Sequence, residues 1–423
     1  MKPGKMIAVI LIFCIFASFY SCGTNKESQK ESRITAEIAG IAYEYNDSEK
    51  FEDVLRKFSL NSASVIFSDE KNNKKNLCYS PASLYVAFAL AASGAENQTR
   101  DEMFAALGLT GRDKKYISEQ INDLFGKLSF ENHYGVLKIA NSVWLKKDAD
   151  IKKEYKENAN DNFHSQIFSA DFKNIPETPD MMKKWVEENT NNLISPKFDY
   201  SDPEIIFMYI LNTLYFKDSW RDSFDKRSTQ SDLFYAADNK QVECEFMNKL
   251  ISAHPFFSGE GFTASSLDLY NGGKMTFVLP DEETDIYDLL SSPKKLDYIF
   301  NQANEKTGNV HFKVPKFKTQ ASFDLIGTLK YMGVKQAFIA ETADFSGITG
   351  EQIYISEVAQ ETYIKIDETG VEAAAMTRVE VKAGGLLAPN EQVNMFLDRP
   401  FIYFITDKGG VILFEGVIFD PKS

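Results

Sequence analysis

The chain has 423 residues, which is too long for one small domain and suits one large α+β domain or two ordinary ones. Apolar residues make up 43% and charged residues 26%, a balance typical of a folded chain with a core rather than of disorder. Lysine and arginine number 47 and acidic residues 61, and the formal net charge of −14 argues against a nucleic-acid partner, whose phosphates need basic surfaces.

Residues 1–22 have the pattern of a secretory signal. Two lysines precede an uncharged apolar run over residues 6–20, which is shorter than the ~20 residues of a membrane-spanning helix. A small residue stands directly before Cys22, as at a bacterial lipoprotein cleavage site, although Phe19 departs from the usual Leu or Val. We expect lipidation at Cys22, with a signal anchor or ordinary cleavage as alternatives.

The polar residues 23–48 are predicted to be a tether between this signal and a folded part. The chain would then be secreted across the inner membrane and held at the bacterial envelope by its lipid anchor, or released outside the cell. Membrane contact is expected only through that anchor.

Helix signals come early in the folded part. The first predicted helix begins at Ser80, a capping residue followed by proline, and ends at Gly94. Because it is apolar nearly all round, it is expected to be buried. A second helix is predicted to begin at Thr99, which would form a capping box with Glu102. A third is predicted over residues 180–194.

Strand signals follow these helices. The near-continuous apolar run 204–216 is typical of a central strand, and shorter strands are predicted at 274–279 and 309–317. Residues 401–405 and 411–419 flank an Asp-Lys-Gly-Gly turn and predict a hairpin. Helices early and strands late favour an α+β fold with large antiparallel or mixed sheets.

The most informative stretch is 371–383, which alternates with a period of two. One face is small or β-branched throughout, and the other is mostly charged. As a strand it would span roughly 43 Å, longer than most strands. The turn-prone residues 384–390 and the helix-favouring alanines 373–375 conflict with a permanent strand. An ordinary edge strand followed by a loop is the alternative interpretation.

The sequence lacks the usual signatures of catalysis. The motifs of phosphate-binding loops, zinc proteases, dithiol redox sites and the serine-hydrolase elbow are all missing, and the four histidines are scattered. We therefore predict no catalytic residue, no metal site and no cofactor. Four cysteines are too few for a disulfide scaffold. Cys78 and Cys244 are predicted to be packed or free thiols, although a bridge between them stays open.

From about residue 50 to the C-terminus the sequence resembles the serpin family. The resemblance rests on separated motifs in family order, at residues 76–83, 94–95, 212–220, 224, 314–317, 343–347, 370, 398–401, 414–416 and 420–421. It implies a serpin fold over residues 49–423. That fold is α+β, with a large central mixed β-sheet, further sheets, helices packed around them and an exposed reactive-centre loop at about residues 367–395.

The resemblance changes the interpretation of the period-two stretch. It implies a serine-type endopeptidase inhibitor that acts as a suicide substrate: the protease cuts the loop, residues 371–383 insert into the central sheet, and the protease stays covalently trapped. Insertion needs a hinge of small residues, and those in the hinge positions are Gly370, Val371, Glu372, Ala373, Ala374 and Ala375. Valine replaces the commoner threonine at the second position but remains β-branched.

The position of the cut is less closely determined. In the family it falls about fourteen residues past the hinge glycine, but this loop is a few residues longer than in many relatives. The expected scissile region is therefore Ala383, Gly384, Gly385, Leu386 and Leu387. It favours elastase-, chymotrypsin- or subtilisin-like serine proteases, with cysteine proteases as further candidates. Lys382 would suit a trypsin-like protease but comes early.

Further positions match two supporting regions of the family. The shutter, beneath the opening sheet, is matched by Ser80, Ser83, Asn212 and Gln360. The last replaces the usual histidine, and we expect it to keep the hydrogen-bond network because an amide both donates and accepts. The breach, at the top of the sheet, is matched by Trp220 and by an ion pair of Glu368 with Lys316.

The sequence leaves three functions to distinguish. The first is a protease inhibitor, expected to be a monomer whose partners are proteases and not nucleic acid. The second is a non-inhibitory serpin that acts as a binding module on the cell envelope. The third, an envelope hydrolase or glycan-binding lipoprotein, would need a pocket with a nucleophile and a base, or an aromatic platform, whereas Trp144, Trp185 and Trp220 stand in contexts typical of a core.

Overall fold

The computed structural model of the protein describes residues 49–198, 203, 206–237, 240–290, 292–301, 305–371 and 391–423. Several predicted features lie outside the described residues: the signal segment with Cys22, the tether, the hinge residues Glu372, Ala373, Ala374 and Ala375, and the scissile region from Ala383 to Leu387. Among the described helices, none is both long enough and apolar enough to cross a membrane.

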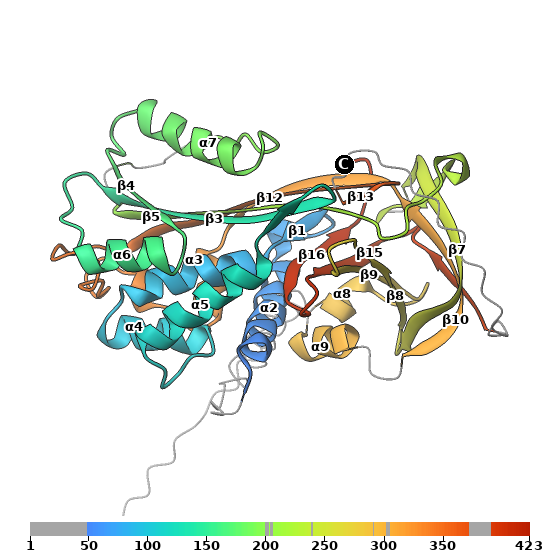
Figure 1. Ribbon diagram of the computed structural model, residues 1–423, viewed down its shortest axis with the longest axis horizontal. Coiled ribbons are helices and arrows are strands. Elements are labelled where there is room, and N and C mark those ends of the chain that lie inside the picture. Colours follow the sequence, from blue (N-terminus) through green and yellow to red (C-terminus); the bar gives the residue numbers. More distant parts are fainter. Residues whose placement is uncertain are drawn as a thin grey trace, which may run out of the picture.

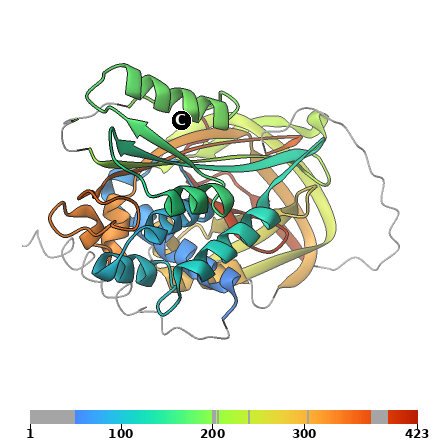
Figure 2. The same ribbon diagram turned by 60° about the vertical axis from the view of Figure 1, so that its left-hand side comes forward.

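The helices lie on both faces of a central sheet. The α-helices in the described part are α2 (Phe51–Ser68), α3 (Pro81–Ser93), α4 (Asn97–Ala106), α5 (Lys114–Leu128), α6 (Lys153–Asp161), α7 (Glu177–Asn189), α8 (Ile286–Leu290), α9 (Pro293–Asn301) and α10 (Ile326–Tyr331). Short 3-10 helices are η1 (Glu70–Asn72), η3 (Lys226–Ser228) and η5 (Gln336–Phe338). Figures 1 and 2 show α7 alone above the central sheet and α3 to α6 below it.

Seven described strands form the central sheet. In order across the sheet they are β11 (Phe317–Asp324), β12 (Ile355–Asp367), β13 (Gly370–Val371), β5 (Met208–Ser219), β3 (Gly135–Lys146) and β2 (Phe130–Asn132), with β4 (Gln166–Ala170) also paired to β3. The pairs β12–β5 and β3–β4 are parallel and the others antiparallel. The sheet is therefore large and mixed, as predicted.

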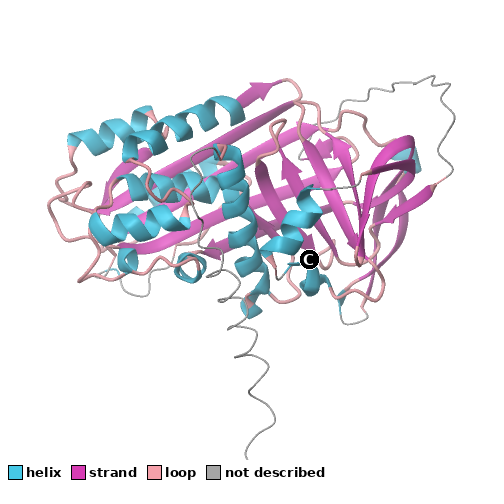
Figure 3. Ribbon diagram, turned by 90° about the horizontal axis from the view of Figure 1, so that it is seen from below, coloured by secondary structure: helices cyan, strands magenta, loops and turns pink. Residues whose placement is uncertain are grey.

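A second sheet of nine described strands fills the other half of the molecule (Figure 3). Its order is β1 (Leu77–Tyr79), β16 (Ile412–Ile418), β15 (Phe401–Thr406), β9 (Lys274–Pro280), β8 (Phe262–Asp268), β7 (Gln241–Gly259), β10 (Lys306–Pro315) and β14 (Gln392–Phe396), with β6 (Gln230–Tyr235) paired to β7. The predicted hairpin is confirmed as β15 and β16, which pair antiparallel. The α+β prediction is confirmed.

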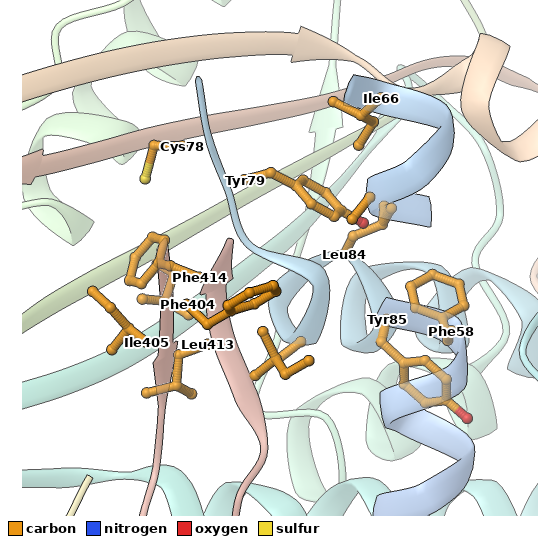
Figure 4. Close-up of a cluster of buried hydrophobic side chains, with 14 of the residues drawn as sticks. Phe58, Ile66, Cys78, Tyr79, Leu84, Tyr85, Phe404, Ile405, Leu413 and Phe414 are labelled. Atoms are coloured by element: carbon orange, nitrogen blue, oxygen red, sulfur yellow. The ribbon is translucent and has the colours of Figure 1, made fainter. Parts of the chain in front are cut away.

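The two sheets share one core around α3. Every residue of α3 is buried, so the prediction of a buried helix ending at Gly94 is confirmed. Figure 4 shows aromatic and aliphatic side chains from α2, α3, β1, β15 and β16 packed together, with Tyr79 and Phe414 among them. The ring centroids of Phe414 and Phe216 are 6.2 Å apart, and this contact links the second sheet to β5 of the central sheet.

Some helix and strand boundaries differ from the predictions. At α4 the two predicted capping side chains bind residues that are distant in sequence. The hydroxyl of Thr99 accepts a hydrogen bond from the backbone N–H of Asp344, and Glu102 accepts two from Lys335 and Gln336. The capping box was therefore wrong, and α4 begins two residues earlier, at Asn97. Two other boundaries also differ: α7 ends at Asn189, and the strand predicted at 309–317 is two strands on either side of residue 316.

Cys78 and Cys244 are free and buried, which confirms their prediction as packed thiols. Burial raises the pKa of the Cys78 thiol to about 12 and that of Cys244 to about 11. We expect neither thiol to react with iodoacetamide at pH 8 in the native protein, and both to react in denaturant, because the thiolate is the nucleophile. Peptide mass spectrometry reads each site separately, and rapid native labelling of Cys78 would contradict this packing.

Candidate functional site

The two strands at the centre of the sheet, β5 and β12, are paired over only part of their lengths. Parallel pairing runs from Met208 and Ile355 to Thr213 and Glu361. Above it, residues 214–217 of β5 and 362–365 of β12 have no ladder partner on their facing edges among the described residues. The central sheet is therefore open between these strands.

The strand β13 occupies the top of this opening. Val371 lies opposite Asp218 of β5 and Ile366 of β12, antiparallel to both strands. Its side chain is 1% exposed and belongs to the main core. The first residues of the predicted hinge are therefore already part of the sheet, and they enter from the end at which a longer strand would have to enter.

Gly370 allows β13 to pair this closely with β5. Its φ is +155°, and a Cβ built there would lie 2.2 Å from the carbonyl oxygen of Asp218 and 2.7 Å from the Cα of Ser219. Both contacts are with backbone atoms, which cannot rotate away as a side chain can. Only glycine lets the chain approach β5 this closely.

Val371, in the central sheet, is the last described residue before residue 391, from which the described chain continues into the second sheet. It enters that sheet at β14, which pairs in parallel with β10 at the sheet's edge. The predicted scissile region lies between these two ends, outside the described residues. A cut there would separate β13 from β14, which belong to different sheets.

The predicted shutter residues Ser83, Asn212 and Gln360 meet beneath the opening. The Asn212 side-chain N–H groups donate to the Ser83 hydroxyl and to Asn141 Oδ1, each at 2.6 Å. The Asn212 Oδ1 accepts from Gln360 Nε2 at 3.0 Å. Asn212 lies opposite Gln360 on β12 and opposite Asn141 on β3, so one side chain joins three neighbouring strands to α3.

Gln360 also holds the start of α3. Its Oε1 accepts from the backbone N–H of Ser80 at 2.9 Å, and its Nε2 donates to the Ser80 carbonyl at 2.8 Å. Ser80 takes part through its backbone alone, and its hydroxyl has no hydrogen-bond partner among the described residues. The prediction that the Ser80 side chain caps the helix was therefore wrong, because Gln360 binds the backbone at that point.

At the top of the opening, Trp220 holds the turn between β12 and β13. Its indole N–H donates to the Asp367 carbonyl at 2.9 Å, and its backbone N–H donates to the Thr369 carbonyl at 3.0 Å. The side chain is 2% exposed, so Trp220 is a core residue as well as a contact of the hinge.

Lys316 and Glu368 form an ion pair beside this turn. The Lys316 Nζ lies 3.4 Å from Glu368 Oε1 and 3.1 Å from Glu245 Oε2. Burial opposes the charge of Lys316, but the two carboxylates outweigh it and raise the pKa of its ammonium group. The Thr229 hydroxyl also donates to Glu368, at 2.9 Å. Lys316 joins β10 to β11, so this cluster connects the two sheets where the hinge enters.

Sequence reasoning missed three members of these clusters. Asn141 is one of few polar residues in the apolar run 137–145, and that interruption was the only local signal. Thr229 and Glu245 carry no signal, because only the folded chain brings Thr229 to Glu368 and Glu245 to Lys316. Among the described residues no group of three or more His, Cys, Asp or Glu side chains could hold a metal ion.

Comparisons with known proteins agree with this architecture. The family described as "Serpin (serine protease inhibitor)" matches residues 54–421. Serpin-ZX of Arabidopsis thaliana is 29% identical, with 86% of this chain and 96% of the plant protein covered. An uncharacterised serpin-like protein of Thermococcus kodakarensis is 30% identical, with 85% and 84% covered.

Two solved structures place the fold in the same group. A thermophilic serpin, Tengpin, in its native state is 28% identical with a TM-score of 0.78, and 90% of this chain and 98% of that chain are covered. A thyroxine-binding globulin in complex with thyroxine is 26% identical with a TM-score of 0.76, and 89% and 100% are covered. The fold therefore also occurs in a protein whose structure holds a small molecule, thyroxine.

Proposed function

Because the chain belongs to the serpin family, whose general function is protease inhibition, we propose that it inhibits serine endopeptidases as a suicide substrate. One observation carries this proposal. The strand β13 is seated at the top of an opening between β5 and β12, and the edges below it have no strand partner among the described residues. A strand that continued from β13 would fill that opening.

The proposed reaction takes place between β13 and β14. The serine hydroxyl of the protease attacks the scissile carbonyl, the C–N bond breaks, and the new amino group leaves with the chain that enters β14. The protease remains attached through an ester to the part that continues from β13. Hydrolysis of that ester by water would release an active protease, so inhibition requires that insertion come first.

Insertion is favoured because β13 is already paired on both sides. Each residue that follows it gains ladder hydrogen bonds to β5 and β12, each worth about 1 kcal/mol net. The small face of residues 371–383 would be buried without overpacking the core. The attached protease would be carried along the sheet and its catalytic geometry distorted.

The shutter contacts control this opening in the proposed mechanism. The Gln360–Asn212 hydrogen bond spans the two strands that must separate. By continuation of the β13 register, Thr377 would come to lie between Asn212 and Gln360. Its hydroxyl can both donate and accept, so it can replace the contact that insertion breaks.

The target class and the location are part of the same proposal. The scissile region at residues 383–387 is small or aliphatic, which suits elastase-, chymotrypsin- or subtilisin-like proteases, with cysteine proteases as further candidates. A lipid anchor at Cys22 would hold the inhibitor at the cell envelope, where it would protect envelope proteins.

A protease panel tests the proposal directly. The purified protein is incubated with elastase-, chymotrypsin-, subtilisin-, trypsin- and papain-type enzymes. We expect at least one of the first three to form a complex that survives denaturing gel electrophoresis, with a cut between Ala383 and Leu387 located by intact mass. If every enzyme cleaves the loop without forming a complex and keeps its full activity, the proposal that the protein is an inhibitor is wrong.

The alternative is a non-inhibitory serpin that acts as a binding module. It is favoured by the similarity to a thyroxine-binding globulin, whose structure holds thyroxine on the same fold. In that case loop cleavage would leave the protease free, which the same panel would report, and thermal unfolding of the cleaved protein would show no gain in stability.

A further inference from the structure

The register of β13 determines where each residue of an inserted loop would lie. Val371 is opposite Asp218 and Ile366, and Gly370 is opposite Ser219 and Asp367. In an antiparallel pairing, each later loop residue lies one position earlier on both neighbouring strands. The parallel register of β5 with β12 agrees, because Asn212 lies opposite Gln360 and Thr213 opposite Glu361.

The two faces of β12 have different surroundings. Val358, Ile364 and Ile366 pack into the main core. Ala359 and Tyr363 point to the opposite face, into the cluster that α7 covers. Glu361 and Lys365 share this α7 face by the period of two. The charged face of residues 372–382 would therefore lie beside Glu361 and Lys365 after insertion.

The first charge in the loop would meet two cations. If the β13 register continued, Glu372 would lie between Lys217 of β5 and Lys365 of β12. Lys217 has no acidic partner within 4 Å among the described residues, and Lys365 is 3.2 Å from Asp367. A slip of two residues toward the top of the sheet would place Glu372 beside Asp367, where like charges repel.

The cation of the loop would meet a buried carboxylate. After insertion in this register, Arg378 would lie opposite Ala359 and Leu211, whose side chains are small or apolar, and diagonally beside Glu361. Glu361 is 5% exposed; its Oε1 accepts from the Ser322 hydroxyl at 2.6 Å, and no cation of the described residues lies within 4 Å. Diagonal neighbours in a sheet are about 7–8 Å apart, within reach of an arginine.

Glu357 is a second carboxylate on the same face of β12. It lies diagonally on the other side of Arg378, while Glu380 of the loop would come opposite it. Repulsion between those two carboxylates is offset by Arg378 and Lys382, which flank Glu380 on the same face. The clearer pairing is therefore that of Arg378 with Glu361.

We propose that the α7 face of β5 and β12 is a charge template for the inserted loop, in which Arg378 pairs with Glu361 and Glu372 lies between Lys217 and Lys365. This inference rests on the proposed insertion mechanism and adds to it. The small inner face of the loop permits insertion, and the charges on its outer face set its register and favour its completion.

Charge reversal tests the Arg378–Glu361 pair. Arg378→Glu and Glu361→Lys are compared with the parent protein, using a protease that the parent traps. Each single change should raise the number of inhibitor molecules consumed per trapped protease by about twofold to fivefold, the range expected for one opposite-charge pair in a sheet. It should also lower the thermal midpoint of the loop-cleaved protein.

The double variant Arg378→Glu/Glu361→Lys restores the pair with reversed charges and should return both quantities toward the parent values. Lys115→Glu on α5 makes the same charge change as Arg378→Glu at a side chain that is 81% exposed, and should change neither quantity. A parent that traps proteases while Arg378→Glu behaves like Lys115→Glu would overturn the template. A parent that traps nothing would instead overturn the proposed function.

Discussion

Replacing Gly370 with valine should convert the protein from an inhibitor into a substrate. The added Cβ would lie 2.2 Å from the Asp218 carbonyl oxygen, 2.7 Å from the Ser219 Cα and 3.0 Å from the Trp220 backbone nitrogen. None of these atoms can move without displacing β5, so β13 would lose its seat. Insertion would then start from an unpaired chain, and hydrolysis of the ester would come first.

We expect the number of inhibitor molecules consumed per trapped protease to rise at least about tenfold. A tenfold change corresponds to about 1.4 kcal/mol in the difference between the activation free energies of insertion and hydrolysis. The measurement is a titration of residual protease activity, with gels that report cleaved and complexed protein. Gly350→Val is the matched control, because a Cβ there meets nothing within 4 Å. If Gly370→Val traps protease with the same number of inhibitor molecules consumed as the parent, the pairing of β13 with β5 and β12 is not needed for inhibition.

Local patterns predicted the parts of the fold that local physics determines. The buried helix α3, most of β5 and the hairpin of β15 and β16 all follow from apolar periodicity and turn residues. The strand β12 was missed, because Glu357, Gln360, Glu361 and Lys365 interrupt its apolar pattern. Those polar groups are accommodated by partners such as Ser80, Asn212 and Ser322, which are remote in sequence.

The candidate site could likewise be predicted only in part. The resemblance named Asn212, Gln360 and Trp220, and the structure places them in contact with the opening and its hinge. It could not show that β13 is already seated, because that depends on the distance between two backbones. Nor could it reveal Asn141, whose role comes from lying opposite Asn212 on a neighbouring strand. Register is a property of the folded sheet and not of either strand alone.

Replacing Glu415 with methionine should stabilise the protein at neutral pH. Glu415 is fully buried on β16, opposite Tyr79 of β1 and Phe404 of β15. Neither of its carboxyl oxygens has a hydrogen-bond partner among the described residues. Burial holds the pKa of this carboxyl well above its usual value of 4.5. Methionine fills a similar volume without the cost of desolvating a polar group, which is about 1–3 kcal/mol.

The sign of the pH dependence follows from that raised pKa. Between pH 4.5 and the pKa in the folded state, the folded protein keeps the proton of Glu415 and the unfolded chain releases it. The contribution of Glu415 to stability is therefore fully present below pH 4.5 and is lost as the pH rises toward the folded pKa. The stability advantage of Glu415→Met should accordingly be larger at pH 8 than at pH 4.5.

The measurement is the difference in thermal unfolding midpoint between variant and parent at a fixed scan rate, across this pH range. Other groups with raised pKa, such as Asp218 and Glu361, titrate in both proteins and largely cancel in the difference. Glu415→Gln keeps a buried polar group that cannot titrate. Its thermal midpoint relative to the parent should therefore rise with pH as that of Glu415→Met does, but the gain in midpoint should be smaller. A difference that stays constant from pH 4.5 to 8 in both variants would mean that Glu415 has an unseen partner in the folded protein.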